Sequence, residues 1–169
     1  YRDFVDNIAY PENSEVNDHG THVAGTILGQ QSNSVNRIGV APGAKFISAR
    51  AIGPEGGEVS DLLAAAQWML EMKPDVINNS WGGPNDNDEW FKDIINAWNS
   101  AGIVPVFAAG NTSSKVPGPG SISNPGNYLD VISVAAVDHN KQVGRFSNKG
   151  PSAFDSGKSI IKPEISAPG

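Results

Sequence analysis

The feature that most constrains the fold of this sequence is an alternation of short apolar runs with helix-like segments. Strands are predicted at residues 45–51, 75–79, 103–108 and 130–137. The last three runs are almost continuously apolar, which suits strands that are buried on both faces of a sheet. A strand–helix–strand order with connections of this length predicts parallel strands with right-handed crossovers. The expected fold class is therefore α/β.

Apolar residues at three-and-four spacing predict the helices. One helix is expected from His19 to about Leu28, with Gly29 able to end it. A second begins at Val59 or Ser60 and ends before Pro74.

A third helix is expected to be capped by Asn87 or Asp88, with Glu89 in its first turn and Gly102 as its left-handed stop. Residues 112–127 are rich in Ser, Pro, Gly and Asn, which predicts a long surface loop. Loops of that length without regular structure are more often functional than not.

Charge and composition exclude several classes of protein. The 169 residues contain 12 Lys+Arg and 18 Asp+Glu, a net charge of −6, which argues against a nucleic-acid-binding module. No apolar stretch approaches the ~18 residues of a membrane helix, so no membrane partner is expected. Cysteine is absent, so the expected single domain must hold its core without disulfides.

Two glycine-containing segments follow predicted strands. Residues 80–83 read Ser-Trp-Gly-Gly, and residues 109–111 read Ala-Gly-Asn. Ligands of open parallel sheets bind beyond the carboxyl ends of the strands. Glycine lets a ligand backbone approach closely, because it has no Cβ. These two segments are therefore the candidate binding edge.

The densest chemical signal is Asp-His-Gly-Thr-His-Val-Ala-Gly-Thr at residues 18–26. His19 and His22, helped by His139, could ligate zinc, although the Glu of the His-Glu-x-x-His pattern is absent. Both histidines could instead be structural, or His19 could be a general base. A dinucleotide site is disfavoured, because Gly118-Pro119-Gly120 neither follows a strand nor opens a helix.

The 18–26 motif closely resembles the histidine motif of the subtilisin-like serine peptidases. Three further blocks match that family in order: Arg-Ile-Gly-Val-Ala-Pro-Gly-Ala at 37–44, Asn-Ser-Trp-Gly-Gly at 79–83, and Ala-Ala-Gly-Asn at 108–111. Residues 162–169 resemble the segment before the family's serine helix. The resemblance implies a three-layer α/β fold, with a mostly parallel central sheet and helices on both faces.

The resemblance also implies roles for individual residues. His19 is expected to be the triad histidine, with His22 structural, and Asn111 the side-chain donor of the oxyanion hole. An extended protein or peptide substrate is expected to bind Ser80, Trp81, Gly82, Gly83, Ala108, Ala109, Gly110 and Thr112. Because Thr112 is uncharged, the sequence gives no reason to expect a charged substrate side chain before the scissile bond. Trp81 is bulky and is expected to narrow a neighbouring subsite.

The family's aspartate and serine motifs do not occur in the sequence. They are expected about 32 residues before and about 157 residues after the histidine. We therefore expect residues 1–169 to be the central segment of one peptidase domain. The isolated chain is expected to be inactive, and either partly unfolded or self-associated through surfaces exposed by truncation. The alternative function is a non-catalytic peptide-binding module of peptidase-like fold.

The resemblance allows a structural calcium ion to be bound, although the proposed chemistry needs no cofactor. The first candidate loop, at residues 29–36, has no carboxylate, but its carbonyl and amide oxygens could bind a hard cation. The second, weaker cation site is expected near Gly126, Tyr128 and Val131. By the same resemblance, the protein is expected to be extracellular.

Overall fold

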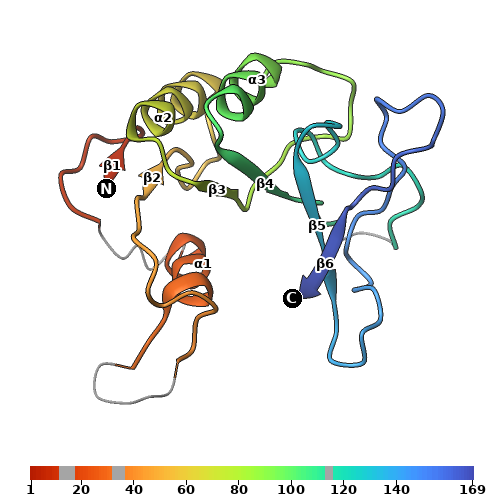
Figure 1. Cartoon of the computed structure of the whole chain (residues 1–169), viewed down its shortest axis with the longest axis horizontal. Coiled ribbons are helices and arrows are strands. Elements are labelled where there is room, and N and C mark those ends of the chain that lie inside the picture. Colours follow the sequence, from red (N-terminus) through yellow and green to blue (C-terminus); the bar gives the residue numbers. More distant parts are fainter. Residues whose placement is uncertain (12–17, 32–36, 113–115) are drawn as a thin grey trace. The chain divides into compact units, whose positions relative to one another are not determined.

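The structure is a computed structural model, which describes residues 1–11, 18–31, 37–112 and 116–169. In these residues every pair of named strands is parallel. Contacts divide the chain into two compact units, Tyr1–Met69 and Leu70–Gly169. The elements of both units are shown in Figure 1. An α/β fold built on parallel strands is confirmed.

The first unit holds a two-stranded sheet and two helices. Its elements are β1 (Arg2–Asp3), α1 (His19–Leu28), β2 (Ala49–Arg50) and α2 (Val59–Met72), whose last turn belongs to the second unit. β1 pairs with β2 through Arg2↔Ala49 and Asp3↔Arg50. The Trp68 ring of α2 packs on Phe4, directly after β1, with 5.9 Å between ring centroids. This contact holds α2 to the small sheet.

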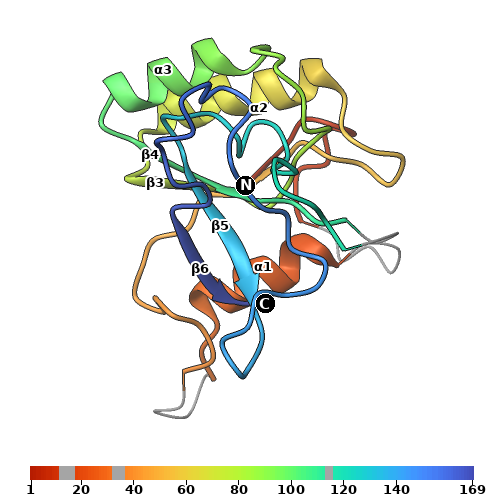
Figure 2. The same cartoon turned by 90° about the vertical axis from the view of Figure 1, so that its right-hand side faces the viewer.

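The second unit is built on a four-stranded sheet in the order β3-β4-β5-β6. The strands are β3 (Val76–Asn79), β4 (Val104–Ala108), β5 (Ile132–Val137) and β6 (Ile165–Pro168), and α3 (Lys92–Ser100) connects β3 to β4. Figure 2 shows α3 on one side of the sheet. The core lies between them, where Phe91, Ile95, Trp98 and Phe107 are almost fully buried.

The structure confirms the predicted helix at His19–Leu28 and the start of α2 at Val59. The predicted start of the third helix is wrong, because α3 begins at Lys92 and Asp93 occupies its first turn. Asp88 closes a local turn instead, with its carboxylate accepting from the Trp90 N–H. Its carbonyl oxygen accepts from Tyr128 and Asn124, so tertiary contacts keep this segment out of the helix.

The strand prediction at 45–51 is too long, because only Ala49–Arg50 finds a partner and β1 offers two residues. β1 and β6 were not predicted as strands. The expected burial of both strand faces is not met in β3 and β4. Exposed Val76 and Val104 alternate there with buried Ile77 and Phe107, because α3 covers one face.

Thr112 and residues 116–127 form no helix or strand, which confirms the predicted loop there. Its predicted surface position is wrong for residues 122 and 124–127, which are buried, because Asn124 and Asn127 donate to the carbonyls of Asp88 and Asp86. The longest described helix, α2, has 14 residues. None in the described part is long and apolar enough to cross a membrane.

Candidate active site

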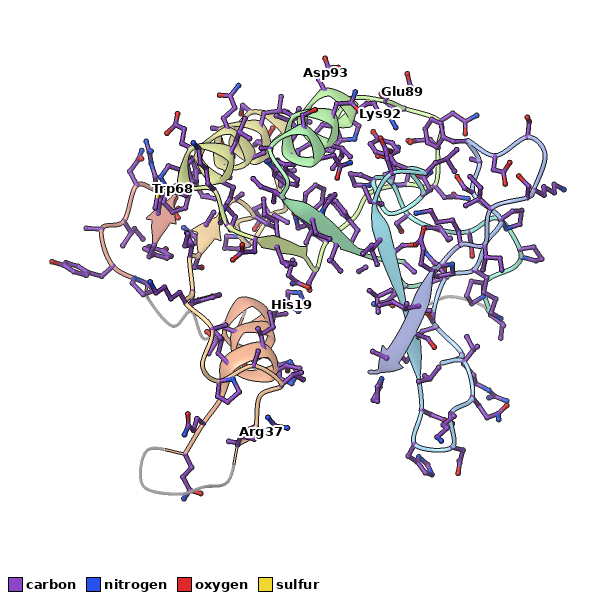
Figure 3. The ribbon with its side chains drawn as sticks, in the orientation of Figure 1. His19, Arg37, Trp68, Glu89, Lys92 and Asp93 are labelled. Atoms are coloured by element: carbon purple, nitrogen blue, oxygen red, sulfur yellow. The ribbon has the colours of Figure 1, made fainter. Side chains whose placement is uncertain are left out.

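His19 is the first residue of α1, and Figure 3 shows it at that end of the helix. The first turn is closed by the His22 N–H, which donates to the Asp18 carbonyl at 2.9 Å. Both histidines are exposed, and Val23, Ala24 and Ile27 form a half-buried face. α1 thus presents the His19 imidazole on its first helical turn, at an exposed position.

The block at residues 37–44 folds back on the carboxyl end of α1. Val40 and Ala41 donate backbone hydrogen bonds to the carbonyls of Thr26 and Ile27, at 3.1 and 2.7 Å. A Cβ on Gly39 would lie 2.4 Å from the Gly29 nitrogen, so only glycine fits this contact. The block therefore satisfies two of the last carbonyls of the helix that begins at His19.

The carboxyl end of β4 turns sharply at Gly110, whose φ is +89°. A Cβ at this position would lie 2.0 Å from Ser123 Oγ, so both the backbone angle and the space require glycine. Backbone hydrogen bonds fix the turn: Ser123 donates to the Ala109 carbonyl at 2.9 Å, and Asn148 donates to the Gly110 carbonyl at 3.0 Å. Asn111 is thus held in a rigid turn.

The Asn111 side chain is exposed and hydrogen-bonds to no described residue. Its backbone forms an isolated bridge with Ser147. The next residue, Thr112, donates through its N–H to the Phe146 carbonyl and through Oγ1 to Asn148 Oδ1, at 2.9 and 2.7 Å. A preorganised backbone therefore presents a side-chain amide that has its N–H groups available.

The second edge segment begins at the carboxyl end of β3, where Asn78 Nδ2 donates to Ser80 Oγ at 2.9 Å. The Gly83 N–H donates to the Asn124 carbonyl at 2.8 Å. Gly82 is close to Ser123, since a Cβ there would lie 3.0 Å from Ser123 Cβ. The segments at 80–83 and 108–111 therefore meet through the loop at 121–127.

Two hollows flank this junction, and together they include most of the predicted binding residues. One, of about 360 Å³, is lined by Gly83, Asn111, Thr112, Gly120, Ser123 and Asn148, among others. The other, of about 380 Å³, includes Ser80, Ala108, Ala109, Gly110 and Asn111 in its lining. His19 belongs to the first unit, and the structure does not place it relative to these hollows.

Trp81 lies in neither hollow but packs in an aromatic cluster. Its ring is 5.5 Å from Phe91 and 5.4 Å from Phe107, with both pairs edge to face, and 6.2 Å from Trp90. Packing against the core accounts for its size. A narrowed subsite beside Trp81 stays a prediction.

Sequence reasoning missed Ser123 and Asn148, which position the Gly110 turn. Asn148 Nδ2 donates to Ser123 Oγ at 3.3 Å, and Asn148 Oδ1 accepts from Thr112. The composition of 112–127 predicts a loop, but turn residues do not reveal which distant strand end they contact.

The candidate metal sites have different outcomes. Residues 32–36 of the first calcium loop lie outside the described part of the chain. No group of three or more His, Asp or Glu that could hold a metal ion occurs among the described residues. At the second cation site, the Val131 carbonyl already accepts a hydrogen bond from Lys162 Nζ at 2.6 Å. One of the two lone pairs of the Val131 carbonyl oxygen is therefore already used by the lysine.

Burial raises the pKa of Tyr128, the second residue of that candidate site, above its usual 10.0. Its hydroxyl donates to the Asp88 carbonyl at 2.9 Å and accepts from the Phe91 N–H at 3.3 Å. The tyrosine thus ties the loop to the segment before α3.

Comparison with known proteins shows similarity along the whole chain. The model of the subtilase family matches residues 2–169. Bacillopeptidase F of Bacillus subtilis (strain 168) is 50% identical over 163 residues, which are 89% of this chain and 11% of the relative. Subtilisin Savinase of Lederbergia lenta is 34% identical, covering 92% of this chain and 54% of the relative.

Among solved structures, Sphericase aligns with a TM-score of 0.77 and 31% identity, over 99% of this chain and 58% of that one. The chain thus spans about half, or less, of the length of these relatives. The histidine motif, the glycine turn before Asn111 and the parallel sheet all lie within the matched residues. The chain belongs to the subtilase family.

Proposed function

We propose that this chain supplies the histidine and the oxyanion-binding asparagine of a serine endopeptidase. The observation on which this rests is the Asn111 amide, exposed and without a described hydrogen-bond partner in a turn that Gly110, Ser123 and Asn148 fix. Acyl transfer builds negative charge on the former carbonyl oxygen, and a preorganised amide N–H stabilises that charge. Within this family, loss of the donor lowers turnover about 10²–10³-fold.

His19 acts as the general base. A serine hydroxyl attacks the scissile carbonyl carbon while the His19 imidazole takes its proton, and the imidazolium then protonates the leaving amine. A carboxylate is needed to orient the imidazole. The family's serine and aspartate motifs do not occur in the 169 residues, so other residues of the protein must supply both groups.

The substrate is a polypeptide in extended conformation. Among the strands that the structure describes, β3 lies at one edge of its sheet, so residues 80–83 continue a strand that can pair with a peptide backbone. The hollow beside Asn111 has polar but uncharged walls, including Thr112, Ser123 and Asn148. It suits an uncharged side chain before the scissile bond.

The isolated 169 residues are proposed to be inactive and to self-associate. Val76 and Ile165 are each 55% exposed, and Val104 is 40% exposed. An exposed sheet with these apolar side chains favours contact with a second copy. Size-exclusion chromatography that shows a stable monomer would contradict self-association.

The family resemblance supports an extracellular location for the protein.

The test is labelling with a fluorophosphonate, followed by intact mass, on the chain extended at both ends into its native neighbouring sequence. The extended protein should gain one label on a serine. His19→Ala should abolish labelling, because the serine loses its base. Asn111→Ala should lower peptide turnover about 10²–10³-fold.

His22→Ala is the matched control, since it removes an imidazole one turn further along the same exposed helix. This variant should keep its label. An extended protein that folds and binds peptide but never labels would contradict the proposal and favour a non-catalytic peptide-binding module.

A further inference from the structure

Lys162 is a fully buried lysine three residues before β6 begins. None of its side-chain area is exposed, whereas 30% of the side chain of its partner Glu164 is exposed. A lone buried ammonium is costly, so its partners must replace the water that it has lost. Those partners determine what the charge does in this part of the fold.

The ammonium lies between one carbonyl and one carboxylate. Nζ donates to the Val131 carbonyl at 2.6 Å and lies 2.5 Å from Glu164 Oε1. The other carboxylate oxygen, Oε2, accepts from the Ser133 backbone N–H at 2.7 Å and from Ser133 Oγ at 3.0 Å. Lys162 and Glu164 thus connect the beginning of β5 to the segment that enters β6.

Burial lowers the pKa of Lys162 from its usual 10.5, while the hydrogen bond and the negative charge of Glu164 oppose that shift. Asp130 also favours the charged form, and Lys92 disfavours it. Lys92 is itself paired with Asp130 at 2.5 Å. The charges around the buried ammonium are therefore arranged in pairs.

Carbonyl and carboxylate oxygens are the ligands that Ca²⁺ prefers, at 2.3–2.6 Å. Lys162 Nζ lies within that range of both oxygens, at 2.6 Å from the Val131 carbonyl and 2.5 Å from Glu164 Oε1. A metal ion therefore cannot occupy the same position. We propose that the Lys162 ammonium is a built-in cation, which links Val131 to Glu164 and closes this corner of the fold to metal ions.

The proposal predicts that removing the ammonium increases the sensitivity of the protein's stability to calcium. Thermal unfolding of the extended protein is measured in excess EDTA and in excess calcium chloride. In EDTA, Lys162→Met should lower Tm by about 5–10 °C, because Glu164 and the Val131 carbonyl lose their partner. Calcium should raise the Tm of this variant by more than it raises that of the unaltered protein.

Lys158→Met is the matched control, because Lys158 is exposed and its side chain forms no ion pair among the described residues. Its Tm and calcium response should equal those of the unaltered protein. A Lys162→Met variant whose calcium response also equals theirs would overturn the proposal.

The double variant Lys162→Met/Glu164→Gln keeps the test decisive if the single variant fails to fold. Neither side chain is then charged, and the amide oxygen that replaces the carboxylate can still accept from Ser133, so part of the lost Tm should return and no added calcium response should appear. A double variant as unstable as Lys162→Met would instead show that the lysine acts through packing, against the proposal.

Discussion

The two compact units each contain an ion pair in which one side chain is fully buried, but the buried charge is negative in the first unit and positive in the second. In the first unit Asp3 has no exposed side-chain area, and its partner Arg50 is 29% exposed. In the second unit the lysine is buried and the glutamate is 30% exposed. The comparison shows how the same contact has different consequences when the anion, and not the cation, is enclosed.

Hydrogen bonds to the charged form explain the difference. Burial alone would raise the pKa of Asp3, but bonds from the Val5 and Asp6 backbone N–H groups and from Arg50 bring it below 3.8. For Lys162, burial outweighs the help of Glu164, so its pKa falls below 10.5. The anion is thus stabilised in its charged form, whereas the buried cation depends on few acceptors.

The largest expected effect comes from breaking the second pair. Glu164→Gln leaves the Lys162 ammonium buried without its counter-charge and should lower the free energy of unfolding by about 3–5 kcal/mol. Denaturant unfolding of the extended protein measures the change. Glu71→Gln, on exposed helix surface, is the control and should change little. Equal losses in the two variants would mean that Glu164 contributes no more than a surface carboxylate.

An intermediate effect is expected at Asp3. Asp3→Asn should cost about 1.5–3 kcal/mol at neutral pH, the usual contribution of hydrogen bonds to a charged group. Arg50 keeps Asp6 at 2.7 Å, which limits the loss. Asp6→Asn, at a position whose side chain is 53% exposed, should cost less than about 1 kcal/mol.

The pH dependence of the Asp3 effect has a definite sign. Because the folded pKa lies below 3.8, the stability that Asp3 contributes is complete above that value. It is lost as the pH falls through the folded pKa, so the difference between the parent protein and Asp3→Asn should shrink in acid. A difference that stays constant from neutral pH to strong acid would refute this assignment.

The smallest effect is expected at the pair between Lys92 and Asp130, whose side chains are 30% and 35% exposed. Water screens this pair, so Lys92→Gln should lower the unfolding free energy by less than about 1 kcal/mol, and added salt should reduce the loss. Chemical denaturation at low and high salt measures it. A loss as large as that of Glu164→Gln would show that burial does not separate the two pairs.

Local sequence patterns predicted the elements that are stabilised by contacts between residues close together in the sequence. α1 and α2 have the three-and-four apolar spacing, and α2 ends before Pro74 as expected. The start of α3 could not be predicted, because Tyr128 and Asn124 bind the Asp88 carbonyl from 40 and 36 residues away. β2 is short because its partner β1 has only two residues, and the sequence of β2 alone does not contain that information.

The candidate site divides in the same way. The motif around His19 and the order Gly110-Asn111 are readable in the sequence, because both depend on residue types at fixed local spacing. Ser123 and Asn148 could not be found, since their contacts with the Gly110 turn join segments that are distant in sequence.

The sequence by itself determined the α/β class, the family and the residues proposed for proton transfer and oxyanion binding, because these depend on local spacing and residue type. Only the tertiary structure decided that Lys162 is buried between Val131 and Glu164 and that Asp3 faces Arg50. The physical reason is that burial and charge pairing depend on which distant segments the fold brings together.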